Sequence, residues 1–414
     1  MLITHIKALI GVHPKETLVL HGSEMALLPI LENAWLLLED GLIKDFGPMS
    51  TCPSSVEKDQ QKSLSAEGKY VFPSWCDSHT HIVFAASREE EFVMKIEGKG
   101  YEEIAAAGGG ILNSANKLAK ASEDELFESA CTRVVDMLKQ GTGAIEIKSG
   151  YGLTFESELK MLRVIKRLKN KFPIPIKATL LAAHTYPQAY KNNHQGYIDL
   201  IINEMLPAVA EEKLADYIDV FCERGFFSVE ETDQILSAAN RFGLKPKIHA
   251  NQLSISGGVQ IGVKHGAISV DHLEETDDEV LNSLANSATI ATLLPSCSFY
   301  LNIPFANARG LMRHHAAVAL ATDYNPGSTP SGNMNFVVSL ACIKLKMMPE
   351  EAINAATLNG AAAMQISGDM GSIAIGKIAN LFISRTMPSI AYLPYSFGQS
   401  QIETVILNGE VYNG

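Results

Sequence analysis

The sequence predicts an α/β fold, a (β/α)8 TIM-like barrel with a small β-sandwich built from both ends of the chain. Three observations carry this prediction. Residues 69–370 alternate eight apolar strand candidates with helical patterns, which is the count of a (β/α)8 barrel. Residues 1–68 and 371–414 contain short strand-like runs. The 414 residues suffice for one large barrel and a smaller unit.

The two ends of the chain read as short strands and turns. An apolar run of strand length covers residues 34–38, and a strand between glycines covers 41–47. Residues 380–384 and 403–407 have the same character, and the Asn-Gly pair that follows them predicts a hairpin turn. We therefore expect both ends to pair into one unit; two unrelated β extensions are the alternative.

Apolar runs of strand length predict the barrel strands. The alternative, an open doubly wound sheet, would carry a Gly-x-Gly-x-x-Gly phosphate turn after an early strand, and the sequence has no such motif. The predicted strands cover residues 71–77, 143–148, 176–184, 217–223, 246–249, 267–272, 289–294 and 318–323.

Helical patterns lie between most of these strands. Residues 122–140 begin with Ser-Glu-Asp-Glu, an N-cap followed by acids that suit the positive end of a helix. Residues 155–169, 197–215 and 228–242 have similar apolar spacing, and the last of these opens with Ser-Val-Glu-Glu. Three glycines at 108–110 follow three alanines, and we interpret them as a mobile active-site loop.

Composition indicates a soluble globular protein and argues against binding to nucleic acid. Hydrophobic residues make up 46% of the chain and charged residues 19%. A net charge of −12 opposes the basic face that nucleic acid requires. The six cysteines are scattered without a Cys-x-x-Cys, so neither a disulfide framework nor a cysteine zinc site is expected. Without a signal-peptide pattern or a membrane-length apolar stretch, we expect a cytoplasmic protein.

His79 and His81 are the most informative pair in the chain. They end the run Val-Phe-Pro-Ser-Trp-Cys-Asp-Ser-His-Thr-His, and alternate side chains of a strand share a face, so both imidazoles can meet one metal ion. A His-x-His pair alone is a weak signal, since an ordinary surface or core pair has the same spacing. Its place after a buried strand, early in an α/β pattern, favours a metal.

Further polar residues stand at the ends of other predicted strands, where barrel enzymes build their sites. His184 ends the third strand, His249 the fifth, His272 the sixth and Asp323 the eighth. Imidazole and carboxylate ligands suit zinc or ferrous iron. Three histidines and a carboxylate leave room for a water, whose pKa falls to ~7 on zinc. These residues predict hydrolysis at an unreactive carbonyl or amidine carbon.

This arrangement resembles the amidohydrolase superfamily, which has a metal-dependent barrel and a β-sandwich made from both chain ends. Bimetallic members carry a bridging lysine at the end of the fourth strand; here that strand ends Phe-Cys-Glu at 221–223, so the resemblance is to the mononuclear branch. Within that branch the motifs resemble the members that open an imidazolone ring in histidine degradation. Lys-Ser-Gly-Tyr-Gly-Leu at 148–153 and Asp-Tyr-Asn-Pro-Gly at 323–327 are the specific segments, and the resemblance spans nearly the whole chain.

The resemblance implies hydrolysis of the ring amide of 4-imidazolone-5-propanoate to N-formimidoyl-L-glutamate. It also implies one divalent metal per chain, zinc or iron, and a possible homodimer. His79, His81, His249 and Asp323 would hold the metal, while His272, Asp323 and Gln252 would be the catalytic residues. The implied substrate-binding residues are Arg88, Tyr101, Tyr151, His184, Gln252, Asn325, Gly327 and Ser328.

Several assignments have alternatives. Arg88 precedes three glutamates and could form a surface ion pair. Gln252 stands where ring deaminases of the superfamily usually carry glutamate, and an amide cannot transfer protons, so the base is sought in His272 or Asp323. Lys148 and Glu223 are either ligands or members of buried ion pairs.

Two other functions compete with imidazolone hydrolysis. A nucleobase-type deaminase of the same superfamily is disfavoured by Gln252 and by Arg88, which suits a carboxylate. A non-catalytic scaffold with this fold is disfavoured because it has no need for four metal ligands. We expect a small-molecule substrate and neither a nucleic-acid nor a membrane partner.

Overall fold

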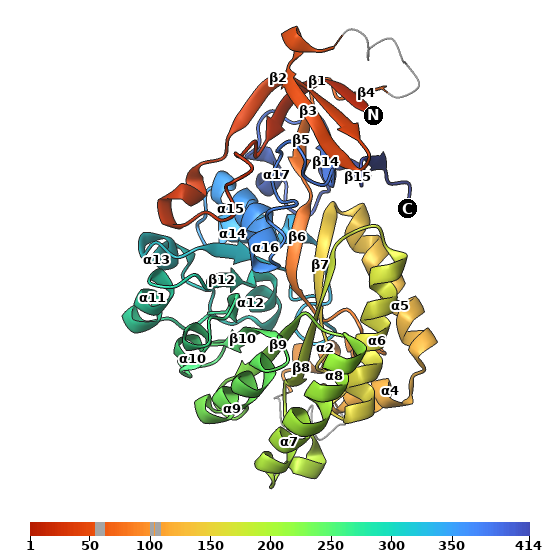
Figure 1. Ribbon diagram of the computed structural model, residues 1–414. Helices are drawn as coiled ribbons and strands as arrows, with labels where there is room; N and C mark the ends of the chain where they lie inside the picture. Colours follow the sequence, from red (N-terminus) through yellow and green to blue (C-terminus); the bar gives the residue numbers. More distant parts are fainter. Residues whose placement is uncertain (54–62, 100–102, 104–108) are drawn as a thin grey trace.

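The computed structural model describes residues 1–53, 63–99, 103 and 109–414. In this part of the chain, eight parallel strands form a near-closed barrel in the order β6 to β13, each paired with its neighbours in sequence (Figure 1). The predicted barrel is therefore confirmed. Its strands are β6 (Trp75–Thr80), β7 (Thr142–Lys148), β8 (Ile176–Ala183), β9 (Tyr217–Cys222), β10 (Lys245–Ala250), β11 (Ser269–His272), β12 (Ile290–Leu293) and β13 (Val318–Leu320).

Hydrogen bonds near the strand ends join the first barrel strand to the last. Asp323 donates its backbone N–H to His79 O at 3.0 Å. Thr322 donates its backbone N–H and its hydroxyl to the buried carboxylate of Asp77, at 3.0 and 2.6 Å. Barrel closure thus brings the His-x-His segment beside the aspartate that the sequence placed at the eighth strand.

Strands from both chain ends pair into one unit, as predicted, and in the described chain this unit is a single mixed sheet where a β-sandwich was expected. The order is β16-β15-β14-β5-β1-β2-β3, with β4 paired to β1. In Figure 1 this sheet lies above the barrel, and β6 runs down from it. Its strands are β1 (Leu2–Ile10), β2 (Ile30–Glu39), β3 (Leu42–Pro48), β4 (Ser63–Ser65), β5 (Tyr70–Pro73), β14 (Leu381–Ser384), β15 (Ile402–Leu407) and β16 (Glu410–Val411).

The single strand predicted at 71–77 is wrong, because the structure divides it in two. β5 ends at Pro73 and β6 begins at Trp75, while Ser74 between them donates its N–H to Asn380 O at 3.0 Å. Proline has no N–H with which to continue a ladder. β5 belongs to the terminal sheet, because it pairs with strands from both chain ends, although its residues follow the predicted boundary at residue 68. The division into 1–68 with 371–414 and 69–370 stays a prediction.

Alternation along β5 and β14 lets the terminal sheet face two cores. Val71 and Leu381 point into the sheet's own apolar core. Phe72 and Phe382 point the other way, into the core shared with the barrel. Their rings stack at 4.9 Å, and the ring of Trp75 lies 4.9 Å from that of Phe382. This aromatic cluster attaches the terminal sheet to the first barrel strand.

Helices cover the outside of the barrel (Figure 1). As predicted, Ser122 and Ser228 are N-caps with capping boxes. The helix predicted at 197–215 is continuous only through a π-helical turn, Ile201–Met205, and ends at Lys213 in a left-handed conformation. The helices are α2 (Glu89–Ile96), α4 (Ile111–Lys120), α5 (Glu123–Lys139), α6 (Phe155–Lys171), α7 (His194–Leu200), α8 (Leu206–Glu212), α9 (Val229–Asn240), α10 (Gly258–Lys264), α11 (Asp278–Ala285), α12 (Pro295–Leu301), α13 (Ala308–Arg313), α14 (Met334–Ile343), α15 (Pro349–Ala356), α16 (Leu358–Ala363) and α17 (Tyr392–Tyr395). Among the described residues, none of these helices has the length and apolar character to cross a membrane.

Replacing Phe382 by alanine should lower the free energy of unfolding by about 3–5 kcal/mol, because it empties the aromatic contact between sheet and barrel. Equilibrium urea unfolding measures the loss. Phe397→Ala is the control: this side chain is 63% exposed and its loss should change stability by no more than about 0.5 kcal/mol. Equal losses in the two variants would contradict the attachment described above.

Candidate metal centre and substrate pocket

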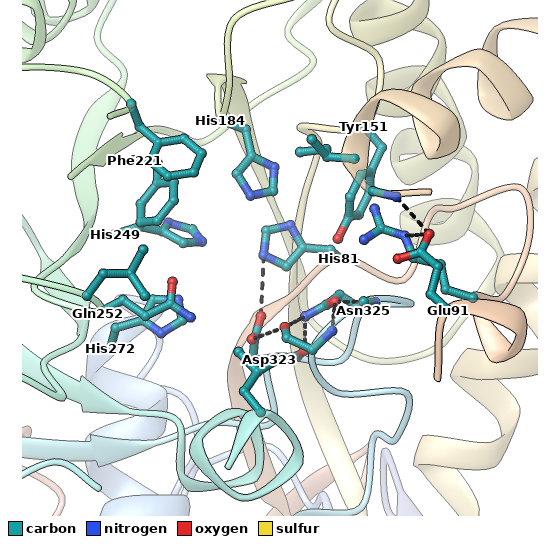
Figure 2. A pocket seen from close by; sticks show the side chains of 18 of the residues that line it. His81, Glu91, Tyr151, His184, Phe221, His249, Gln252, His272, Asp323 and Asn325 are labelled. Atoms are coloured by element: carbon teal, nitrogen blue, oxygen red, sulfur yellow. Dashed lines mark hydrogen bonds and ion pairs between the residues drawn. The ribbon is translucent and has the colours of Figure 1, made fainter. Parts of the chain in front are cut away.

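The carboxyl ends of the barrel strands surround a cavity of about 370 Å³, a volume suited to a small molecule (Figure 2). His79 lies beneath it, in contact with His81. Tyr101 and Gly108 lie outside the described residues, whereas Gly110 lines the cavity and is the N-cap of α4. The predicted site residues that line it are His81, Arg88, Tyr151, His184, His249, Gln252, His272, Asp323, Asn325, Gly327 and Ser328.

Three histidines and an aspartate converge at the floor of this cavity. Ring nitrogens of His79, His81 and His249 lie within 4.8 Å of one another. Asp323 Oδ1 lies 3.5 Å from His79 Nε2 and 3.6 Å from His81 Nε2. All four side chains are at most 4% exposed. The structure thus brings together the four residues that the sequence proposes as metal ligands.

Acceptors behind the rings determine which nitrogen faces the cavity. His79 Nδ1 donates to Asp271 Oδ2 at 2.6 Å, and His249 Nδ1 donates to Asp219 Oδ2 at 2.9 Å. A neutral imidazole that carries its proton on Nδ1 presents a lone pair on Nε2. Among the described residues His249 Nε2 has no hydrogen-bond partner. Lone pairs that converge in this way fit a divalent cation, so the residues present suit a metal.

Burial also favours the neutral, ligating form of these rings. It lowers the pKa of His79 and of His249 well below the usual value, and the nearby ammonium of Lys148 lowers both further. Burial raises the pKa of Asp323 to about 6, although its hydrogen bond from Ser328 acts in the opposite direction. A cation between these groups would offset the cost of burying the carboxylate.

Two site residues hold a backbone conformation that non-glycine residues rarely adopt. His272 has φ 89° and Asp323 has φ 56°. Such a conformation costs about 1–3 kcal/mol, and it persists only where the surrounding structure imposes it. Both residues lie at the carboxyl ends of barrel strands and turn their side chains toward the cluster of candidate metal ligands (Figure 2).

His272 sits at the side of the cluster. Its ring lies 5.3 Å from that of His249, and its Nδ1 lies 3.5 Å from Glu274 Oε2 in a buried ion pair. Burial lowers the pKa of His272, but the carboxylates of Glu274, Asp323 and Asp271 together outweigh it, so the pKa is raised overall. Gln252 borders the same space and donates to Cys297 Sγ at 3.5 Å.

Arg88 reaches the opposite end of the cavity from the loop before α2. Its side chain is 13% exposed and its Nε lies 3.8 Å from Glu91 Oε1, so the ion pair considered from the sequence does form, but it is largely buried and not at the surface. Its Nε donates to Ser114 Oγ at 2.9 Å, while the buried Nη2 has no partner among the described residues. A Cβ at Gly327 would lie 2.5 Å from Arg88 Nη1, so a side chain at this position would push the guanidinium aside.

The remaining predicted residues form the walls. Tyr151 lies beneath the guanidinium of Arg88, whose carbon is 5.7 Å from the ring centre. His184 stacks on His81 at 5.5 Å, and burial lowers the pKa of His184 to about 4. Asn325 makes its hydrogen bonds within the 323–328 loop, donating to Asp323 O and to Ser328 Oγ and accepting from two backbone N–H groups.

Buried polar side chains that the sequence analysis missed hold the loops of the site. The carboxylate of Glu158 accepts the backbone N–H groups of Gly150, Gly152 and Leu153 at 2.7–3.1 Å, which places Tyr151. A Cβ at Gly152 would collide with the backbone of the helix that carries Glu158. In the sequence, Glu158 reads only as an exposed acid in the first turn of a helix, so no local pattern distinguishes it.

The two residues left open are now placed. Glu223 is neither a ligand nor part of an ion pair in the described chain: it accepts hydrogen bonds from the backbone of Leu253 and Ser254, next to Gln252. Lys148 belongs to a buried ion-pair network and donates to Asp219 Oδ2 at 2.8 Å. A signal for Asp219 was present, because a carboxylate inside the apolar strand at 217–223 must be paired.

Comparison with known proteins agrees with this geometry. The amidohydrolase family profile matches residues 70–412, so the chain belongs to the amidohydrolase family. The guanine deaminase of E. coli shares this fold, with a TM-score of 0.74 and 14% identity over 99% of this chain and 98% of that one. An atrazine chlorohydrolase from Arthrobacter aurescens TC1, solved in complex with zinc, has a TM-score of 0.70 and 13% identity over 99% and 94% of the two chains.

Sequence relatives place the chain more narrowly. It is 54% identical to the imidazolonepropionase of Christiangramia forsetii over 99% of both chains. It is 55% identical to that of Flavobacterium johnsoniae, again over 99% of both. Within the amidohydrolases the chain is thus a member of the imidazolonepropionases, and the sequence-based assignment to this hydrolase family is confirmed.

Replacing Glu158 by alanine should loosen the loop that presents Tyr151, because it leaves three backbone N–H groups without an acceptor. The expected loss of stability is about 1–3 kcal/mol, with faster amide hydrogen exchange at residues 150–153. Glu156→Ala, on the exposed side of the same helix, is the control and should leave that exchange unchanged. Unchanged exchange in the Glu158 variant would show that the loop is held by other contacts.

Proposed function

We propose that this chain hydrolyses the ring amide of 4-imidazolone-5-propanoate to N-formimidoyl-L-glutamate. The observation that carries the proposal is a cavity with a metal-ligand cluster on its floor and, at its other end, a buried guanidinium nitrogen that has no partner among the described residues. The substrate has matching parts, a ring carbonyl to be attacked and a propionate carboxylate to be held. The identity with imidazolonepropionases supports the same choice.

The proposal includes one divalent metal per chain, zinc or iron, with His79, His81, His249 and Asp323 as its ligands. When bound, such a metal would polarise the ring carbonyl and lower the pKa of a water. The donor set of three imidazole nitrogens and one carboxylate suits either ion. A cytoplasmic homodimer stays a prediction, supported only by the family resemblance.

The chain's own residues bind the substrate and transfer the protons. Arg88 grips the propionate through two parallel hydrogen bonds, which fixes the substrate along the cavity. Tyr151 and His184 flank the imidazolone ring. His272, held through its Nδ1 by Glu274, stabilises the negative charge that develops on the ring oxygen.

Asp323 and Gln252 have the two remaining roles, proton transfer and substrate orientation. Asp323 takes the proton of the attacking water and passes it to the ring nitrogen as the carbon–nitrogen bond breaks. Gln252 orients the substrate by hydrogen bonding, because its amide has no proton to transfer near neutral pH. The lack of a titratable group there disfavours ring deamination, and the likeness to guanine deaminases at 14% identity extends to the fold alone.

Two assays on the same preparation test the function. Metal-loaded protein should remove the absorbance of 4-imidazolone-5-propanoate and release no ammonia from guanine. Chelation should abolish turnover, and reloading should restore it at about one metal per chain. The His79→Ala/His249→Ala double variant should lose the metal, while His194→Ala, at an exposed position, should retain it. Ammonia release, or a stoichiometry near two, would refute the proposal.

Arg88→Ala should lower kcat/KM by the factor that corresponds to a loss of ~2–4 kcal/mol of substrate-binding free energy, because a charged bidentate contact in a closed site is lost. Lysine at this position should recover only part, since an ammonium lacks the planar fork. Gly327→Ala should resemble Arg88→Ala, because its methyl group would displace the guanidinium. A normal kcat/KM in Arg88→Ala would mean that another group holds the propionate.

His272→Ala should lose on the order of 10²–10⁴ in kcat, the usual range for a positioned acid or base. Gln252→Glu should stay folded, hold metal and keep appreciable activity, because the two side chains are nearly isosteric. Steady-state kinetics on both variants checks the assignment. Near-normal turnover in His272→Ala with none in Gln252→Ala would reverse the two roles.

A further inference from the structure

A closed group of buried charges lies directly behind the metal-ligand cluster. Two lysines and three carboxylates, drawn from the barrel strands β7, β9, β10 and β11, are all 0% exposed: Lys148, Lys247, Glu146, Asp219 and Asp271. Removing such charges from water costs several kcal/mol for each ion, and apolar side chains often stabilise a core equally well. The arrangement of this group therefore calls for a reason other than packing.

Lys148 occupies the centre of the group. Its Nζ lies 2.6 Å from Glu146 Oε1, 2.8 Å from Asp219 Oδ2 and 3.5 Å from Asp271 Oδ2. The two aspartate oxygens that it approaches are the ones that face the metal histidines. Asp219 Oδ2 accepts the Nδ1 proton of His249, and Asp271 Oδ2 accepts that of His79. One ammonium group thus contacts both oxygens that orient two of the proposed ligands.

Lys247 has a different set of partners. Its Nζ pairs with Glu146 Oε2 and donates to Ser78 O at 3.1 Å. Neither of those oxygens accepts a proton from a metal histidine in the described chain. Lys247 therefore neutralises part of the negative charge of Glu146. This leaves the Lys148 ammonium available to the two aspartates.

We propose that Lys148 is a positioning residue for the metal site, acting through Asp219 and Asp271; this rests on the metal ligands proposed above. The ammonium holds both Oδ2 atoms at the distance and angle that each Nδ1–H requires. Without it, three buried carboxylates with only Lys247 between them would repel one another and rotate apart. His79 and His249 would then lose the acceptors that turn their Nε2 atoms toward the metal.

Zinc affinity, measured by competition with a chromophoric chelator, tests this without substrate. Lys148→Met should weaken zinc binding 10–100-fold, the usual effect of losing an outer-shell partner. Lys377→Met is the matched control. It also removes a fully buried lysine, but one whose hydrogen bonds within the described chain all go to neutral groups, Ser367 O and Ser372 Oγ among them. This control should change the zinc affinity by less than about threefold, well below the outer-shell effect.

Lys148→Met alone could fail to fold, so a charge-balanced pair is included. Lys148→Met/Asp271→Asn removes one positive and one negative charge and keeps the net charge of the group. If Lys148 also holds Asp219, the double variant should bind zinc about tenfold more weakly than Asp271→Asn alone. The d–d spectrum of the cobalt-loaded double variant should differ from that of Asp271→Asn, because the direction of His249 changes.

The outcomes separate this inference from the proposed function. Equal zinc affinities in Asp271→Asn and the double variant would overturn the role of Lys148. So would an equal loss in Lys377→Met, which would point to general destabilisation. If the unmodified protein bound no zinc, cobalt or iron, the proposed metal site itself would fail, and with it the basis of this inference.

Discussion

The convergence of three buried histidine nitrogens and one buried carboxylate is the constraint on which the rest of the structure depends. Unpaired lone pairs and a buried carboxylate are unfavourable together, and they are tolerated only where a cation can meet them. The proposed ligands come from distant parts of the chain: His79 lies in the first barrel strand and His81 just after it, His249 lies in the fifth strand, and Asp323 follows the eighth. Only a closed barrel brings these strand ends to one point.

The contacts that close the barrel also position the proposed metal ligands. The backbone bond from Asp323 N–H to His79 O joins the last strand to the first, and it joins two ligand-bearing segments at the same time. Behind the ligands, Asp219 and Asp271 determine the face that His249 and His79 present. Rigid strands therefore carry the metal side of the site, where errors of less than an ångström matter.

Loops carry the substrate side, and buried acceptors restrain them. Glu158 holds the Tyr151 loop, Glu223 holds the loop of Gln252, and Asn325 holds the loop that follows Asp323. In each case a side-chain oxygen replaces water as the partner of backbone N–H groups, which a turn cannot satisfy by itself. This gives the loops the order that a small polar substrate needs, while the loop sequences stay free of regular structure.

The sequence by itself determined the fold class and was enough to propose the metal ligands. Eight apolar runs separated by capped helices allow few architectures. Histidines at strand ends can be recognised from the sequence, because alternate residues of a strand point to the same face. Arg88, Tyr151 and Gln252 came from motifs, and the structure places all three on the cavity wall. The boundary between β5 and β6 was missed because the mostly apolar run from Val71 to Cys76 fits a single strand despite Ser74, and only pairing with other strands divides it.

The tertiary structure decided which charges meet. Glu146, Asp219 and Asp271 lie up to 125 positions apart in the chain, and no local pattern says that their carboxylates share Lys148. It also decided that Glu223 holds a loop and that the guanidinium of Arg88 points inward past Glu91. Hydrogen bonds and ion pairs of this kind are set by three-dimensional distance, which a linear pattern does not encode, whereas apolar periodicity is a local property of the chain.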